Sequence, residues 1–78
     1  MNSDRDAVKF GQTLTNAEFE IYELLVSDLM TFEIADTKKI SVRTVKFHSS
    51  RIYKKLGVSS RYSLIIRHYI NEIARLAA

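Results

Sequence analysis

The chain has 78 residues with no cysteine and no proline, and its formal net charge is +3. This length allows one small domain, and the absence of cysteine excludes disulfides and thiolate metal sites. No apolar run approaches the roughly 18 residues of a membrane span, and the polar N-terminus is unlike a signal peptide, so we expect a soluble, cytoplasmic protein. We divide the chain into a flexible N-terminal arm, residues 1–13, and one helical domain, residues 14–78.

The first helix is predicted to begin at Thr15. Thr15 and Glu18 have the spacing of a capping box, in which each side chain accepts a hydrogen bond from the other residue's backbone N–H. The helix should end near Ser27 or Asp28. Its core-facing side is formed by Phe19, Ile21, Tyr22, Leu24, Leu25 and Val26.

The second helix is expected to be short. Thr31 can cap a helix over residues 32–38, in which Ile34 and Ala35 point toward the core. A turn of about four residues then leads to the next helix, a length that is common between helices of one domain.

The third helix, over residues 42–56, has two contrasting faces at helical spacing, with Ser41 as its cap. The inward residues are Val42, Val45, Ser49, Ile52 and Leu56. The outward residues are Arg43, Lys46, Phe47, Ser50, Arg51 and Lys54. Gly57 should end this helix, because glycine readily takes the left-handed conformation that follows a helix.

The fourth helix should begin after Ser59 or Ser60 and run to about Leu76. Its apolar residues form a stripe that is wider than the core of so small a domain needs, so part of it is expected to meet a partner. The stripe consists of Tyr62, Ile65, Ile66, Tyr69, Ile70, Ile73, Leu76 and Ala77.

Charge is strongly segregated along the chain. No Asp or Glu lies between Asp36 and Glu72, whereas that interval contains nine of the twelve Lys and Arg residues. A short helix, a turn and a longer helix with a basic outer face have the outline of a helix-turn-helix, in which the second helix enters the major groove. The sequence therefore predicts an all-α domain with a nucleic-acid-binding surface.

A family resemblance supports this interpretation. The chain resembles the LuxR/GerE-type helix-turn-helix DNA-binding domain over about Leu14 to Ile66. The matching residues are Leu14-Thr15, Glu18, Glu20-Ile21, Leu24-Leu25, Glu33-Ile34-Ala35, Ile40-Ser41, Thr44-Val45-Lys46, His48, Ile52, Lys55-Leu56-Gly57-Val58 and Ser60-Arg61. The resemblance implies a four-helix bacterial or phage transcriptional regulator, and the chain length is similar to that of stand-alone GerE-like members.

The resemblance also assigns roles to the third helix. It implies that Lys46, Phe47 and Ser50 face base edges. It implies phosphate contacts for Arg43, Thr44, Arg51 and Lys54. Lys38 and Lys39 could approach phosphate from the turn, and Lys55 and Arg61 from the far end, as secondary candidates. The resemblance also suggests structural roles for Lys55 and Arg61.

Some of these residues have simpler explanations. Arg43, Arg51 and Lys54 could form a solvated surface, as charge runs usually do, but the absence of acids around them favours a nucleic-acid contact. Phe47 has two interpretations. It could touch a thymine methyl group, or it could be buried against the first helix or a partner chain.

Dimerisation is expected through the fourth helix, with Ile66, Tyr69, Ile70 and Ile73 as candidate contacts. A two-fold pair would present its recognition helices to successive major grooves about 34 Å apart, which predicts a pseudo-palindromic site.

The chain departs from the family pattern in the first two helices. The departures are Ala17 for Arg, Asp28 for Gly, Met30 for a Ser cap, Phe32 for a polar residue and Lys38 for a core Leu. They sustain a second hypothesis, in which the same fold binds or sequesters another transcription factor and uses Phe32 and Phe47 as anchors. RNA polymerase is a further candidate partner.

Catalysis is the least favoured class. His48 should be structural or a phosphate donor, and His68 should lie on the surface. Without cysteine or a nearby acid, these histidines form no catalytic or metal-binding constellation, so we expect no enzyme activity, metal or cofactor.

Overall fold

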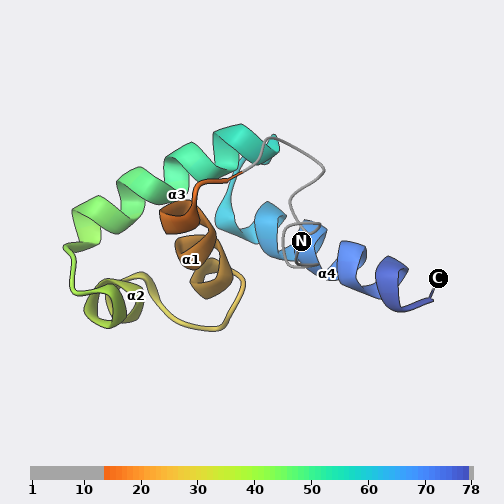
Figure 1. Ribbon diagram of the computed structural model, residues 1–78, viewed down its shortest axis with the longest axis horizontal. Helices are drawn as coiled ribbons and strands as arrows, with labels where there is room; N and C mark the ends of the chain where they lie inside the picture. The colour runs from red at the N-terminus through yellow and green to blue at the C-terminus, as the bar shows by residue number, and fades with distance from the viewer. Residues whose placement is uncertain (1–13, 78) are drawn as a thin grey trace.

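The computed structural model describes residues 14–77, and this range consists of four helices and their connections. The helices are α1 (Asn16–Leu25), α2 (Thr31–Lys38), α3 (Val42–Leu56) and α4 (Arg61–Ala77). The α3 helix packs across α1 and α2, and α4 leaves the far end of α3 and extends away from the other helices (Figure 1). The prediction of a four-helix, all-α domain is confirmed, while the expected arm, residues 1–13, lies outside the described residues. Within the described range, no helix is both long and apolar enough to span a membrane.

The start of α1 is the predicted capping box. The Thr15 hydroxyl accepts a hydrogen bond from the Glu18 N–H at 3.1 Å, and the Glu18 carboxylate accepts one from the Thr15 N–H at 3.0 Å. Two backbone donors that the helix itself leaves unpaired are thereby satisfied. This local pairing fixes the direction in which the Glu18 side chain leaves α1.

The end of α1 was predicted too late. The helix stops at Leu25, before the expected Ser27 or Asp28. The Arg61 guanidinium accounts for the difference, because it donates hydrogen bonds to the carbonyl oxygens of Leu25, at 2.9 Å, Ser27, at 3.2 Å, and Leu29. Those carbonyls therefore turn toward α4 instead of continuing the helix.

The start of α2 was predicted one residue too late. Met30 is the cap and Thr31 is the first helical residue. The Met30 N–H donates to the Glu33 carboxylate at 2.7 Å. The Glu33 and Ile34 N–H groups donate to the Met30 carbonyl at 2.9 and 3.0 Å, so they do not depend on a Thr31 hydroxyl. The α2 helix ends at Lys38, and the left-handed backbone of the next residue, Lys39 (φ 60°), turns the chain toward α3.

Both ends of α3 agree with the sequence prediction. The Ser41 hydroxyl accepts a hydrogen bond from the Thr44 N–H at 3.0 Å. Gly57 is left-handed, with φ 71°, and the Val58 N–H reaches back to the Tyr53 carbonyl at 3.0 Å. Gly57 thus closes the helix in a Schellman arrangement.

The core lies where α1, α2 and α3 meet and is joined by one residue of α4, Leu64. Its buried apolar residues are Leu14, Ile21, Tyr22, Leu25, Val26, Ile34, Ala35, Val45, Ile52, Leu56 and Leu64. Four of the five predicted inward residues of α3 are buried, but Val42 is 37% exposed. Val42 was wrongly assigned because it is the first residue of α3, one turn before the core begins at Val45.

The start of α4 is capped by Ser60. The Ser63 N–H donates to the Ser60 hydroxyl at 3.2 Å, which favours Ser60 over Ser59 as the cap.

Polar contacts also fasten α4 to α1. The prediction that His68 is a surface residue is wrong. His68 is half-buried, and its Nδ1 is hydrogen-bonded to the buried Tyr22 hydroxyl at 2.7 Å. The Tyr22 hydroxyl needs a partner away from water, and His68 supplies it.

A candidate nucleic-acid interface on α3

The outward side of α3 is exposed. We call its six exposed residues the α3 face: Arg43, Lys46, Phe47, Ser50, Arg51 and Lys54. The opposite side packs on α1 and α2 through Val45, Ile52 and Leu56, none of which is more than 1% exposed. One side therefore fixes α3 on the domain, and the other presents cations with no acid in the same stretch of sequence.

Phe47 is exposed among these cations. Its side chain is 59% exposed, so the predicted alternative in which Phe47 is buried against the first helix is contradicted. The Arg51 guanidinium lies 5.7 Å from the centre of the Phe47 ring, within the range of a cation–π contact. The His48 ring meets Phe47 edge-on, with 5.8 Å between ring centres. Two neighbours therefore restrict this exposed ring.

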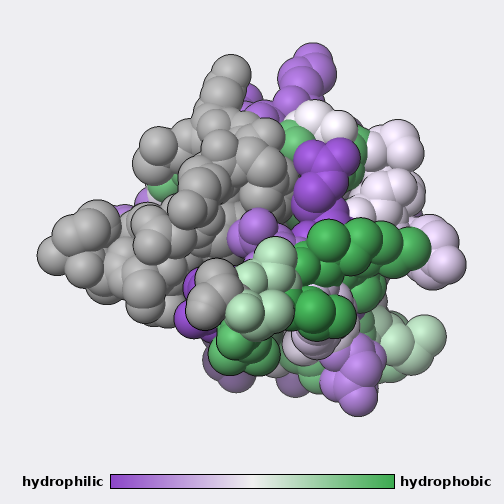
Figure 2. Space-filling model, turned by 90° about the vertical axis from the view of Figure 1, so that its right-hand side faces the viewer, coloured by the Kyte–Doolittle hydropathy of each residue, from purple (hydrophilic) through white to green (hydrophobic). Residues whose placement is uncertain are grey.

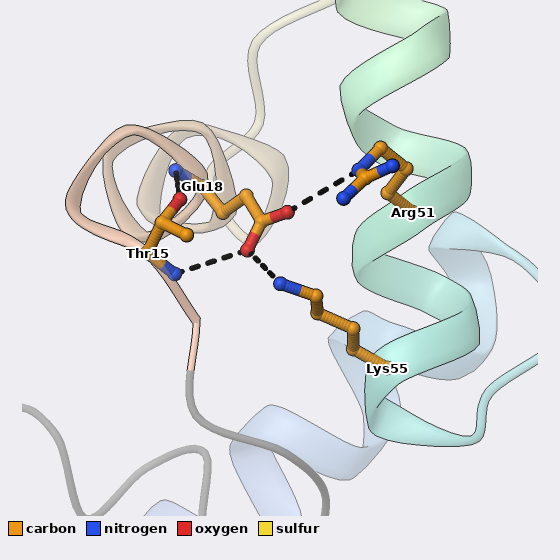
Figure 3. Close-up of polar contacts among 4 residues, drawn as sticks. All are labelled: Thr15, Glu18, Arg51 and Lys55. Atoms are coloured by element: carbon orange, nitrogen blue, oxygen red, sulfur yellow. Dashed lines mark hydrogen bonds and ion pairs between the residues drawn. The ribbon is translucent and has the colours of Figure 1, made fainter.

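A buried carboxylate joins α1 to α3. Glu18 accepts a hydrogen bond from Lys55 Nζ at 2.6 Å, and its second oxygen lies 3.5 Å from Arg51 Nε (Figure 3). The Glu18 side chain is only 6% exposed, whereas the Arg51 side chain remains more than half exposed. Figure 3 shows Glu18 pointing from the capping box toward both cations. These contacts fix α3 relative to α1.

The surroundings of Glu18 strongly favour its charged form. Burial raises the pKa of this carboxyl, but hydrogen bonds from Lys55, Thr15 and Arg51, together with the charge of Lys55, outweigh burial and lower the pKa to about 2. Glu18 therefore keeps its charge over the whole physiological range. Sequence reasoning assigned Glu18 only to the helix start and did not foresee its role between helices.

The secondary candidates differ in what they contact. Lys38 pairs with Glu20 of α1, and Lys55 pairs with Glu18. Arg61 is turned inward to the carbonyls after α1, as described above, so its guanidinium is used within the domain. Thr44 is half-buried and contacts the Ser41 hydroxyl at 2.9 Å. Lys39 is exposed at the turn.

The outward side of α4 is the second accessible surface. Its large apolar side chains are between 41% and 76% exposed, and we call them the α4 stripe: Tyr62, Ile66, Tyr69, Ile70, Ile73 and Leu76. Figure 2, which views the molecule from the end where α4 terminates, shows hydrophobic surface gathered there. The Tyr69 hydroxyl donates to the Val26 carbonyl at 3.2 Å, which ties the stripe to the end of α1.

A short helix, a left-handed turn and a longer helix with an exposed cationic side define the class of this protein as a helix-turn-helix DNA-binding domain. Residues 12–68 match the family of bacterial regulatory proteins called the luxR family. The chain belongs to this family, which is one of DNA-binding transcriptional regulators and not of enzymes.

Several known proteins are similar to the chain. The spore germination protein GerE of Bacillus subtilis is 45% identical over 53 residues, which cover 68% of this chain and 72% of GerE. The Fimbriae Z protein of Escherichia coli K12 is 48% identical over 52 residues, 67% of this chain and 25% of that protein. The tetrathionate response regulatory protein TtrR of Salmonella typhimurium is 36% identical over 63 residues, 81% of this chain and 31% of TtrR. The chain thus spans less than a third of the latter two proteins. No solved structure gave a significant match.

Proposed function

We propose that this chain is a sequence-specific regulator of transcription that binds double-stranded DNA with α3 in the major groove. The exposed, acid-free α3 face is the observation that carries the proposal. An α-helix with its side chains is about 10–12 Å across, which matches the width of the major groove, about 12 Å. In this arrangement Lys46, Phe47 and Ser50 face the base edges.

The phosphate contacts come from the same helix and the turn before it. Arg43, Thr44 and Lys54 flank the base-facing residues, and Lys39 extends from the turn. Lys38 and Arg51 remain phosphate candidates, although each also contacts an acid of α1. Such contacts neutralise charge on DNA and make affinity strongly dependent on salt.

The bound form in this proposal is a homodimer joined through α4. Ile66, Tyr69, Ile70 and Ile73 belong to the exposed α4 stripe, and a second copy would cover that apolar surface. Two-fold pairing would bring the recognition helices to successive major grooves, about 34 Å apart, and requires a pseudo-palindromic operator. RNA polymerase or another transcription factor is a further proposed partner.

The test is to select, from random duplex DNA, the sequences that the intact chain binds at a salt concentration of about 0.15 M. Enrichment of an inverted repeat with one half-site for each α3 is the expected result. Recovery of DNA without any shared motif would contradict sequence-specific binding.

A second candidate function is supported by Phe32. This residue is 60% exposed at the first turn of α2, where an apolar side chain gains nothing from the domain's own core. In this alternative, Phe32 and Phe47 anchor another transcription factor, which the domain binds or sequesters. Failure to enrich any DNA motif, combined with loss of partner binding in Phe32→Ser, would favour this function over DNA binding.

A further inference from the structure

The exposed Phe47 ring is part of a chain of contacts that begins inside the domain. The Arg51 guanidinium lies beside the ring, and the Glu18 carboxylate lies 3.5 Å from Arg51 Nε. Glu18 is itself held in place by the Thr15 capping box and by Lys55. A nearly buried acid on α1 thereby restricts an apolar side chain on the opposite, exposed side of α3.

We propose that Glu18 and Arg51 are positioning residues for Phe47, and that they hold its ring against the C5-methyl group of a thymine. This inference rests on the proposed binding of α3 in the major groove. The thymine methyl is the apolar feature that base pairs display in that groove, and a ring can contact it without forming a hydrogen bond. Glu18 does not belong to the α3 face, so its effect on base preference is indirect.

The geometry indicates that Arg51 contacts the Phe47 ring through its planar guanidinium and does not only supply a positive charge for phosphate. Its guanidinium is planar and can lie against the Phe47 ring while Nε faces Glu18, whereas a lysine ammonium has no such planar group. Arg51→Lys therefore retains the positive charge and removes the planar contact. A residue that only neutralised phosphate would tolerate this change.

The experiment uses the intact chain and the duplex obtained by selection, with thymines replaced one at a time by deoxyuridine, which lacks the methyl group. At the thymine that contacts Phe47, we expect wild-type affinity to fall about fourfold, the effect of losing one buried methyl group. Phe47→Ala should bind the thymine and deoxyuridine duplexes equally. Glu18→Gln and Arg51→Lys should each reduce the ratio of the affinity for the thymine duplex to that for the deoxyuridine duplex to less than about twofold.

Lys55→Gln is the matched control, because it removes one ion pair of Glu18, while the Thr15 capping box and the pairing with Arg51, the residue beside Phe47, are left to hold the carboxylate. It should retain the wild-type ratio of about fourfold, whatever its overall affinity. Glu18→Gln keeps an oxygen for the Thr15 N–H, and circular dichroism melting will define a temperature at which every variant is folded.

Two results would overturn the inference while leaving the proposed function intact. One is a wild-type protein that selects a motif but is insensitive to deoxyuridine at every thymine. The other is a methyl preference that Phe47→Ala abolishes and that Glu18→Gln and Arg51→Lys both retain. Absence of any selected motif would instead overturn the proposed function and, with it, this inference.

Discussion

Lys55 donates a hydrogen bond of 2.6 Å to the carboxylate of Glu18 and thereby joins the last turn of α3 to the first turn of α1. The pKa of this carboxyl is about 2 in the folded protein, below its ordinary value of 4.5. The folded state therefore favours the charged form. The resulting stabilisation is complete above pH 4.5 and is lost as the pH falls toward 2.

This linkage predicts an acid-sensitive free energy of unfolding. One pKa unit corresponds to about 1.4 kcal/mol, and solvent screens the half-exposed Arg51, so we expect Glu18 to contribute about 2 kcal/mol. Urea unfolding at pH 7 and pH 3 should show a smaller pH effect in Glu18→Gln than in wild type. Glu23→Gln, at an exposed position of α1, is the control. Equal pH effects in Glu18→Gln and Glu23→Gln would contradict the linkage.

A second pH dependence is expected from His68. Burial lowers the pKa of its imidazole, and the charge of Glu72 opposes this shift in part. Since the folded pKa lies below the unfolded value of about 6.5, protonation favours the unfolded chain. Stability should be complete above about pH 6.5 and fall as the pH decreases below that value.

His68→Gln tests this expectation, because its amide can still bond to the Tyr22 hydroxyl but does not titrate. Thermal melts between about pH 5 and 7.5 should show a steeper loss of stability in wild type than in His68→Gln. Parallel curves for the two proteins would exclude His68 as the source.

Gly57 and Lys39 follow the ends of α3 and α2 in the same backbone conformation, and substitutions at the two positions should change the stability of the domain in opposite directions. Both residues have a left-handed backbone, with φ 71° and 60°. No atom lies within 4 Å of a Cβ added to Gly57, so Gly57→Ala should destabilise the domain by about 1 kcal/mol through backbone conformation alone. Lys39→Gly relieves that conformation and should stabilise the domain, by up to about 1 kcal/mol. Urea denaturation that gave both changes the same sign would refute this explanation.

The sequence predicted most of the local structure because its signals act over a few residues. The Thr15 capping box, the Ser41 cap and the Gly57 stop depend only on near neighbours, and helical spacing alone identified the α3 face. The start of α2 was placed one residue too late for a local reason as well. Thr31 resembles a hydroxyl cap in the sequence, but the cap is Met30, whose N–H bonds to Glu33 and whose carbonyl accepts from Glu33 and Ile34.

The features that could not be predicted are contacts between distant parts of the chain. Tyr22 and His68 are 46 residues apart, and Lys55 is 37 residues from Glu18. Each pair meets only after α3 and α4 have packed on α1, and spacing within one helix contains no information about such pairs. Arg61 is a similar case. The family resemblance suggested a structural role as an alternative to a phosphate contact, but the sequence did not identify its partners, the carbonyls that follow α1.

The dimer proposal makes a direct prediction for α4. Ile70→Glu places a charge on the exposed stripe and should shift sedimentation toward monomer, because an apolar interface does not accommodate an unpaired charge. Arg75→Glu introduces a negative charge at an exposed position on the opposite side of the same helix and should leave the association state unchanged. A wild-type protein that is monomeric at high concentration would eliminate the proposed interface.

Lys46 and Lys54 should affect DNA binding differently, although both are exposed cations on the α3 face. In the proposed complex Lys46 faces a base edge, where loss of a good bidentate contact is worth roughly 1 to 3 kcal/mol at one base pair. Lys46→Ala should therefore weaken binding and change base preference in the selection experiment. Lys54→Ala should weaken binding to all duplexes by the same factor and reduce the salt slope by about one unit, as expected for a lost phosphate contact.

Affinity measured across a salt series on two duplexes that differ at one base pair separates the effects of Lys46→Ala and Lys54→Ala. Identical behaviour of the two variants would refute the assignment of Lys46 to the bases and Lys54 to the backbone.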